Sequence, residues 1–376
     1  MGKQLQEKSI YVIIDKRASV RACHNEMDAG MMKQEKRNME VKQIVFTKKD
    51  TAELLVTDAK KPGPGEVMVK TMFSTISCGT ERANITGNAN VSIVGEPYVS
   101  FPRYGGYSSA GIVEEIGEGV TEVAVGDRVI VSWGCHKTYN TVPMKNVTKI
   151  ESDKISFEEA AVMHIGTFPM AAIRKTRLEM GESALVMGLG ILGLMAVQFA
   201  HAAGATPVIA ADPVKERRDI ALAWGADYAF DPLEADFADK VKAVTGGGAN
   251  VAIEVTGMGA GLDEALDCMA RYGRVALLGC TRDSNFTIDY YRKVHGPGIT
   301  LIGAHTLARP AQESYPGWFT QKDDLKAMMR LSEYGRVDLK KMVFETHSPA
   351  ECTQVYSRLV NDRNFPPVVQ FDWSLL

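Results

Sequence analysis

The chain has 376 residues, a length typical of two domains. Hydrophobic residues make up 45% and charged residues 24%, which excludes disordered, collagen-like and coiled-coil proteins. The 43 Lys and Arg residues are balanced by 46 Asp and Glu residues, so the formal net charge is −3. Without a basic excess, we expect neither a nucleic-acid nor an anionic membrane partner.

The six cysteines are scattered and form no C-x-x-C pair, which argues against a disulfide framework and a four-cysteine zinc lobe. Reduced thiols are typical of cytoplasmic proteins, and we expect that location. The longest apolar run, residues 184–197, is too short and too rich in Gly and Ala to predict a membrane span.

Residues 1–38 are polar and mixed in charge, and they differ from the rest of the chain. We interpret them as a non-native or disordered N-terminal extension, with the natural start at Met39. The codons for residues 33–38 would test this, because a purine-rich stretch there would be a translated ribosome-binding site. The alternative is a genuine but mobile tail.

From Met39 to about residue 165 the pattern is one of strands and turns, with few helical signals. Pro62-Gly-Pro-Gly65 indicates a turn before a strand at residues 66–73. Further strands are expected at residues 41–46, 110–116 and 128–131. The first part of the chain is therefore predicted to be a β-rich domain.

From about residue 168 to 305, strands and helices alternate, which is typical of a parallel sheet with helices on both faces. The C-terminal stretch is predicted to begin with a helix near residue 309 and to return to strands at 343–346 and 368–371. The alternating elements are strands at 184–187, 207–211, 251–255 and 275–278, and helices at 191–203, 214–224 and 261–269.

A glycine-rich turn follows the first of these strands and opens a helix. It reads Gly188-Leu189-Gly190-Ile191-Leu192-Gly193. Gly188 suits the tight turn, Gly190 the approach of a pyrophosphate, and Gly193 close helix–strand packing. The first turn of the helix offers free N–H groups to phosphates. The motif predicts a dinucleotide site.

The next strand ends at Asp212, about 20 residues past the third glycine, where a carboxylate would accept the adenosine ribose hydroxyls. A 2′-phosphate beside this carboxylate would meet like charge, so NAD is favoured over NADP. Arg217 is also placed near the ribose, and together with Lys215 and Arg218 it leaves NADP open. These cations could alternatively be the solvated face of the next helix.

The chain resembles the medium-chain dehydrogenase/reductase superfamily, on its zinc-type alcohol, sorbitol and threonine dehydrogenase side. The resemblance runs from Met39 to Trp373 and rests on several motifs in matching order. These motifs are Pro64-Gly-Glu-Val, Cys78-Gly-Thr-Glu81, Gly111-Ile-Val-Glu-Glu-Ile-Gly, Gly126-Asp-Arg-Val, the glycine turn, Gly225-Ala-Asp, Glu254-Val-Thr-Gly257 and Gly273-Arg-Val-Ala-Leu-Leu-Gly279.

The resemblance implies an α/β fold with a GroES-like β-barrel catalytic domain at 39–167 and 309–376. A Rossmann doubly wound parallel-sheet domain at 168–308 would interrupt it, with the coenzyme between the two. Family members usually form homodimers or homotetramers by joining Rossmann sheets, here through residues 299–303. Further coenzyme contacts are implied at Thr256, Leu278, Gly279 and Cys280.

The family's catalytic zinc is only partly matched. Cys78 matches the first ligand and His164 the third-ligand position, but the Gly-His-Glu histidine is replaced by Tyr107. A catalytic zinc keeps three protein ligands, and the missing one would have to come from Glu81 or His136. We therefore favour a metal-free site and keep zinc on Cys78 and His164 as the alternative.

Without zinc, substrate activation must come from hydrogen bonds. Thr80 matches the family's proton-relaying hydroxyl, Tyr107 could donate a proton to a carbonyl oxygen, and His164 could complete the relay. The competing interpretation of Cys78, Tyr107 and His164 is structural: a buried thiol, a ring packed under the coenzyme, and a bridge at the domain junction. His136 and His305 are open between a site role and none.

We expect an NAD-dependent oxidoreductase that interconverts a secondary alcohol (a polyol, sugar or sugar derivative) and its ketone. Polar residues near the expected site, such as Thr80, Glu81 and Arg82, favour this small-molecule substrate class. One alternative is a zinc-independent quinone or enone reductase of the same superfamily. The other is a dinucleotide-binding homologue without turnover.

Overall fold

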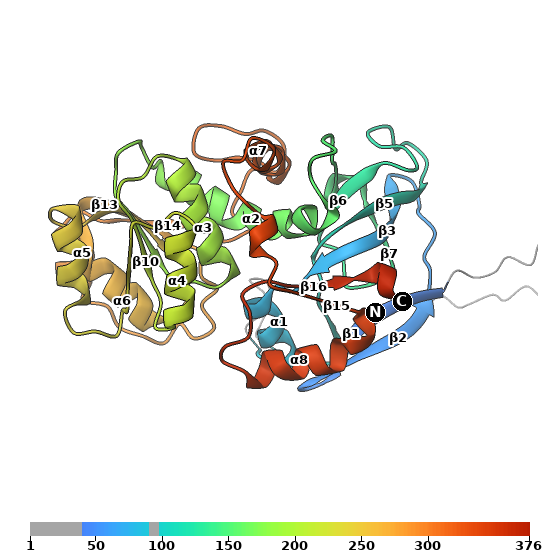
Figure 1. The fold of residues 1–376 in the computed structure, drawn as a ribbon, viewed down its shortest axis with the longest axis horizontal. Helices are drawn as coiled ribbons and strands as arrows, with labels where there is room; N and C mark the ends of the chain where they lie inside the picture. The colour runs from blue at the N-terminus through green and yellow to red at the C-terminus, as the bar shows by residue number, and fades with distance from the viewer. Residues whose placement is uncertain (1–39, 90–97) are drawn as a thin grey trace, which may run out of the picture. The chain divides into compact units, whose positions relative to one another are not determined.

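The structure is a computed structural model that describes residues 40–89 and 98–376 (Figure 1). The extension expected at residues 1–38 lies outside the described residues. Two sheets build the β-rich part of the chain, and a third builds the alternating part. In the described residues, no helix is long and apolar enough to cross a membrane.

The larger sheet of the β-rich part has the order β15-β16-β3-β5-β6-β8, with β7 paired to β3. A second sheet has the order β2-β1-β4. The strands are β1 (Glu40–Lys48), β2 (Thr51–Asp58), β3 (Glu66–Thr75), β4 (Arg103–Tyr104), β5 (Ser108–Ile116), β6 (Arg128–Ser132), β7 (Tyr139–Pro143), β8 (Val147–Lys149), β15 (Glu345–His347) and β16 (Val369–Asp372).

Valine-rich strands of this sheet face a core in which Val67, Val69, Val113 and Val129 pack together. β3 and β5 approach so closely that a Cβ at Gly111 would lie 2.0 Å from the carbonyl oxygen of Lys70. Glycine is required at that position because any side chain would collide with the neighbouring backbone.

The third sheet is entirely parallel, with the order β11-β10-β9-β12-β13-β14. Chain order reverses direction on the two sides of β9, which is the switch point at which doubly wound sheets bind ligands. The strands are β9 (Ala184–Met187), β10 (Val208–Ala211), β11 (Tyr228–Phe230), β12 (Ala249–Glu254), β13 (Met269–Leu277) and β14 (Thr300–Gly303). The helices are α3 (Ile191–Ala202), α4 (Lys215–Ala223), α5 (Phe237–Thr245) and α6 (Gly259–Asp267).

The long helix α2 (Phe157–Thr176) connects the two parts of the chain and is almost completely buried. It begins with a capping box, in which the Ser156 hydroxyl accepts from the Glu159 N–H and the Glu159 side chain accepts from the Ser156 N–H. Its sides contact β5 and β3 as well as α3 and β13. The domain boundary expected at 167/168 falls inside this helix, and the two-domain division stays a proposal.

The C-terminal segment returns to the β-rich part. The helix predicted from about residue 309 is wrong: α7 (Gln321–Glu333) begins only after Thr320, whose side chain caps it. Pro310 and Pro316 interrupt the intervening segment, because proline disfavours a helical conformation in the residue before it. After α8 (Cys352–Asn361), β16 pairs with β3 in antiparallel register. The short α1 (Cys78–Ile85) packs against α8.

Candidate active site

The glycine turn lies between β9 and α3. Gly188 has a φ of +94°, a left-handed conformation that glycine adopts without strain. A Cβ at Gly193 would lie 1.8 Å from the carbonyl oxygen of Gly188, so this glycine lets α3 pack on the turn. At Gly190, within the described part of the chain, nothing lies within 4 Å of an added Cβ. The helix N-terminus is thus open to a phosphate group.

Asp212 follows β10, and its side chain is hydrogen-bonded to the glycine turn. Its Oδ2 accepts from the N–H of Leu189 at 2.8 Å, and its Oδ1 accepts from the N–H of Val214 at 2.9 Å. The residue is 4% exposed, and a guanidinium nitrogen of Arg217 lies 3.8 Å from Oδ2. The carboxylate and one cation are therefore both at the end of the strand where a ribose would lie.

On the other side of the switch point, Glu254 at the end of β12 holds the loop that follows it, a role that its sequence motif does not reveal. Its carboxylate accepts from the N–H of Thr256 at 2.7 Å and of Gly257 at 3.2 Å, and it contacts the Thr256 hydroxyl. Burial raises the pKa of this carboxyl group. A Cβ at Gly279 would lie 2.2 Å from the Gly257 nitrogen, so the loops after β12 and β13 touch.

The other residues predicted to bind the coenzyme lie on the same edge of the sheet. Ile191 and Leu192 open α3, with Ile191 buried and Leu192 partly buried. Leu278 is buried, and its N–H donates to the Glu254 carbonyl at 2.9 Å. Cys280 is exposed and carries a free thiol.

Cys78 and Thr80 lie in the first turn of α1. The Cys78 thiol faces backbone carbonyls, lying 3.5 Å from Pro367 O and 3.6 Å from Pro366 O. Burial, reinforced by the nearby Glu81 carboxylate, raises the pKa of this thiol to about 12. The thiol is therefore protonated at neutral pH and donates to the carbonyls.

Tyr107 lies just before β5 and points its hydroxyl at α1. The hydroxyl donates to the Ser77 Oγ at 2.6 Å and is also within hydrogen-bonding contact of the Thr80 side chain. Burial raises the pKa of Tyr107 to about 12, although the bonds to Ser77 and Thr80 oppose this shift. The structure thus brings together two of the predicted catalytic residues, with Ser77 as a partner that sequence reasoning missed.

His164 lies on α2 among three aromatic rings. Its ring centroid is 4.7 Å from that of Trp133, 5.2 Å from Phe168 and 5.7 Å from Tyr107, all edge-on. The imidazole is fully buried, and neither ring nitrogen has a hydrogen-bond partner among the described residues. Burial and the nearby Arg309 lower its pKa to about 3, so the ring is neutral at physiological pH.

Trp133 is the second residue that the sequence did not single out. Its φ is +61°, an unusual conformation for a bulky residue, and its ring stacks on Tyr107 at a centroid distance of 5.6 Å. The indole N–H donates to the Gln321 side chain at 3.0 Å, and 38% of the residue is exposed. An accessible aromatic surface therefore lies beside Tyr107.

The two residues named as possible third zinc ligands are already paired with each other. Nε2 of His136 lies 3.1 Å from Oε2 of Glu81, and Nδ1 of His136 lies 2.7 Å from the Ser74 hydroxyl. Both residues are fully buried. His136 is therefore a buried residue whose two ring nitrogens face Glu81 and Ser74. His305 is partly exposed, and its Nδ1 accepts from the Leu307 N–H.

The donor set does not fit a three-ligand zinc. Within the described ranges, no group of three or more His, Cys, Asp or Glu side chains is arranged to hold a metal ion. The unpartnered His164 imidazole and the Cys78 thiol could supply two donors. Glu81 is occupied by His136 and by two backbone N–H groups. Tyr107 takes the position at which the resemblance implies a zinc-binding histidine.

The protonation states of the site residues determine which chemistry the site can carry out. Tyr107, Cys78 and His164 are all neutral near pH 7, because burial disfavours the charged form of each. A neutral phenol can donate its proton to an oxygen atom of a substrate. A hydroxyl that is hydrogen-bonded to the phenol can then return a proton to it. The site is suited to proton transfer.

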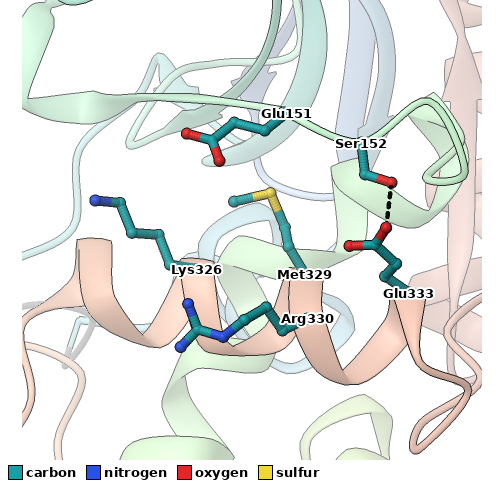
Figure 2. A pocket seen from close by; sticks show the side chains of 6 residues that line it. All are labelled: Glu151, Ser152, Lys326, Met329, Arg330 and Glu333. Atoms are coloured by element: carbon teal, nitrogen blue, oxygen red, sulfur yellow. Dashed lines mark hydrogen bonds between the residues drawn. The ribbon is translucent and has the colours of Figure 1, made fainter.

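A separate pocket of about 310 Å³ lies between α7 and the loop after β8 (Figure 2). None of the candidate site residues lines it. Two of its charged side chains are acidic and two are basic, so the pocket has no single electrostatic preference. The lining residues are Glu151, Ser152, Lys326, Met329, Arg330 and Glu333.

Comparison with known proteins places the chain in a family. Residues 63–172 match the alcohol dehydrogenase GroES-like domain, and residues 192–321 match the zinc-binding dehydrogenase domain. L-threonine 3-dehydrogenase of Thermococcus kodakarensis is 34% identical over 64% of this chain and 75% of that protein. The chain belongs to the medium-chain, zinc-type alcohol dehydrogenase superfamily, and it is an oxidoreductase that acts on small molecules.

Other relatives extend the range of similar proteins. D-guloside 3-dehydrogenase of Escherichia coli is 27% identical over 74% of this chain and 84% of that protein. The fold matches benzyl alcohol dehydrogenase of Acinetobacter calcoaceticus with a TM-score of 0.77 at 21% identity, covering 89% of this chain and 99% of that one. An Escherichia coli alcohol dehydrogenase solved with NADH gives a TM-score of 0.75 at 20% identity, with the same coverage. The GroES-like and Rossmann folds expected from the sequence are confirmed.

Proposed function

We propose that the chain interconverts a secondary alcohol and its ketone, with NAD(H) as coenzyme and without a catalytic zinc. The observation that carries this proposal is the hydroxyl of Tyr107, directed at Ser77 and Thr80 from the position of the family's zinc-binding histidine. Bound NADH supplies the hydride. The residues of this chain supply the proton.

The residues at the switch point support binding of the coenzyme. The open N-terminus of α3 at Gly190 would receive the diphosphate, and Asp212 would accept the ribose hydroxyls. The backbone beyond Thr256 and Leu278 would face the nicotinamide end, as the resemblance implies. In this arrangement Arg217 would approach the ribose from the side of Asp212.

Proton transfer is best supported in the direction of ketone reduction. The Tyr107 hydroxyl would give its proton to the ketone oxygen while the carbonyl carbon accepts the hydride that bound NADH supplies, and the products would be the alcohol and NAD. For this step the Tyr107 hydroxyl would redirect its proton from the Ser77 Oγ, 2.6 Å away, to the ketone oxygen, and the Ser77 hydroxyl would then give its own proton to the phenolate and take one from solvent. The raised pKa of Tyr107 keeps the phenol in its donating form over the whole neutral range.

The substrate class is proposed from the polar surroundings and from the relatives. Two relatives are named for their action on threonine and on a guloside. Two similar solved structures are named for butanediol and galactitol-1-phosphate. A polyol, sugar or sugar derivative fits this range. The fully buried His164 and its three aromatic neighbours would exclude water from the reacting carbon.

Replacement of a single hydroxyl group tests the proposal. We expect the purified protein to oxidise NADH in the presence of a polyhydroxy ketone, and Tyr107→Phe to lower kcat by roughly 10²–10⁴-fold, the range for loss of a general acid. NADH affinity should be unchanged. Tyr334→Phe, an exposed residue, is the matched control. Absence of NAD-linked turnover over a panel of sugars, polyols and ketones would overturn the proposal.

A second candidate is an NADPH-dependent enone or quinone reductase. It is favoured by one observation, the Arg217 guanidinium 3.8 Å from Asp212, which could contact a 2′-phosphate. Rates with NADH and NADPH on an enone separate the two candidates. Higher kcat/KM for the enone with NADPH would support the second.

A homodimer or homotetramer is also proposed. Among the described residues, β14 is one of the two outer strands of the parallel sheet, and Leu301 in its middle is 38% exposed. An unpaired strand edge can pair with the same edge of a second copy. Light scattering of the purified protein measures the mass, and a monomer would contradict this.

A further inference from the structure

A buried pair of a carboxylate and an imidazole lies against the segment that carries Tyr107. Glu81, on α1, and His136, in the loop between β6 and β7, are both 0% exposed. Tyr356 donates its hydroxyl to the same carboxylate from α8. Because an unpaired carboxylate is strongly disfavoured inside a protein, Glu81 needs these partners to remain buried.

The Glu81 carboxylate joins the two segments that carry the proton-transfer groups. Its Oε1 accepts from the N–H of Ser77 at 3.0 Å and from the N–H of Gly106 at 3.3 Å. Ser77 supplies the hydroxyl that contacts Tyr107, and Gly106 directly precedes Tyr107. One oxygen atom thus sets the spacing between the donor and its partner.

The two glycines before Tyr107 lack the side-chain atoms that would collide with Glu81 and His136. A Cβ at Gly105 would lie 2.8 Å from Oε2 of Glu81, and one at Gly106 would lie 2.1 Å from the backbone nitrogen of His136. Gly106 also has a φ of +90°, which disfavours other residues. The backbone therefore passes directly over the Glu81–His136 pair.

We propose that Glu81, held in place by His136, is a positioning residue that sets the Tyr107 hydroxyl against Ser77 for proton transfer. This inference rests on the proposed function. Glu81 itself contacts neither the substrate nor the coenzyme in this arrangement. Its effect on the reaction passes through the positions of Ser77 and Tyr107.

A double-mutant cycle separates positioning from general stabilisation. We expect Glu81→Gln to lower kcat by roughly 10–100-fold, with KM and NADH affinity within about 2-fold of the parent protein. In the Tyr107→Phe background the same substitution should lower kcat by less than about 2-fold, because the group that it positions is gone. An equal loss in both backgrounds would overturn the proposal.

Thr71→Val is the matched control. Thr71 is buried in the same sheet and accepts a hydrogen bond from the Asn140 amide at 3.1 Å, without contact to the pair. Loss of this hydrogen bond in Thr71→Val should lower the melting temperature but leave kcat unchanged. If Glu81→Gln does not fold, His136→Gln, whose amide can still donate to Glu81, enters the same cycle with the same criterion.

A spectroscopic measurement tests the inference without turnover. Trp133 stacks on Tyr107, so its emission, obtained by difference from Trp133→Phe, reports the position of the Tyr107 ring. Glu81→Gln should shift this emission, and Thr71→Val should not. An unshifted emission would overturn the positioning role even in a protein that shows no NAD-linked activity. A shift in an inactive protein would refute only the proposed function.

Discussion

The Oδ2 atom of Asp212 accepts a hydrogen bond from the backbone N–H of Leu189 at 2.8 Å, which joins the end of β10 to the glycine turn after β9. The acid that would select the ribose and the turn that would receive the diphosphate are therefore one connected unit. A change at Asp212 should affect both the choice of coenzyme and the geometry of the turn.

Asp212→Ser is predicted to weaken NAD binding. Loss of a charge-assisted hydrogen bond costs about 1.5–3 kcal/mol, which corresponds to roughly a 10–100-fold higher KM for NAD. The KM for NADP should fall, because Arg217 would then face a 2′-phosphate without the opposing carboxylate. Steady-state kinetics with both coenzymes measure this. Asp219→Ala, exposed on α4, is the control, and an equal effect there would argue against a ribose contact.

The glycine turn allows a prediction that separates binding from folding. Gly190→Ala should leave the melting temperature unchanged and weaken NADH binding by about 10-fold or more, since the new methyl group occupies open space in front of α3. Gly193→Ala should strongly lower the melting temperature, because its Cβ would collide with the Gly188 carbonyl. Thermal unfolding and NADH fluorescence titration test both. If Gly190→Ala binds NADH with normal affinity, the diphosphate does not bind at the N-terminus of α3.

His164 predicts a dependence of stability on pH. Its folded pKa of about 3 lies below the unfolded value near 6.5, so the unfolded state binds one more proton between these values. The free energy of unfolding should fall by about 1.4 kcal/mol per pH unit as the pH drops from about 6.5 towards 3. His164→Leu should remove this contribution to the slope.

Urea unfolding at a series of pH values measures the effect. His201→Ala, an exposed residue on α3, should keep the slope of the parent protein. A slope that is the same for His164→Leu and the parent would show that the imidazole is protonated in the folded state.

The ligand count predicts that activity does not depend on zinc. Dialysis against a chelator should leave kcat within about 2-fold of its starting value, and metal analysis should find far less than one zinc per chain. Cys78→Ser should change neither result, because the thiol faces backbone carbonyls. Stoichiometric zinc that is lost with this substitution would reinstate a metal site on Cys78 and His164.

The fold could be predicted largely because the patterns are local. The glycine turn, the alternation of strands and helices, and the acidic end of β10 all follow from neighbouring residues. The failure near residue 309 has a local cause as well: Pro310 and Pro316 keep the segment before α7 irregular. Helix α2 was missed because it is buried on nearly all sides and shows no clear amphipathic period.

The candidate site was harder to predict because its partners are distant in sequence. Ser77 and Tyr107 are thirty residues apart, and His136 meets Glu81 across fifty-five. Nothing in the sequence of either segment shows that the Glu81 carboxylate is hydrogen-bonded to His136 and is therefore not free to bind a metal ion. Two signals could have helped: the adjacent glycines at 105 and 106, which leave room for the pair, and the Trp133-Gly turn beside the active-site strands.

The position of β16 bears on how the nascent chain matures on the ribosome. This strand lies between β15 and β3, yet it follows the whole parallel sheet in the chain, at residues 369–372. The parallel sheet is complete at Gly303, so the half that would hold the nucleotide can form its ladder while synthesis continues. β3 can pair with β5 and β7 in the meantime, but its end at Phe73–Thr75 stays without its β16 partner until residues 370–372 have been synthesised.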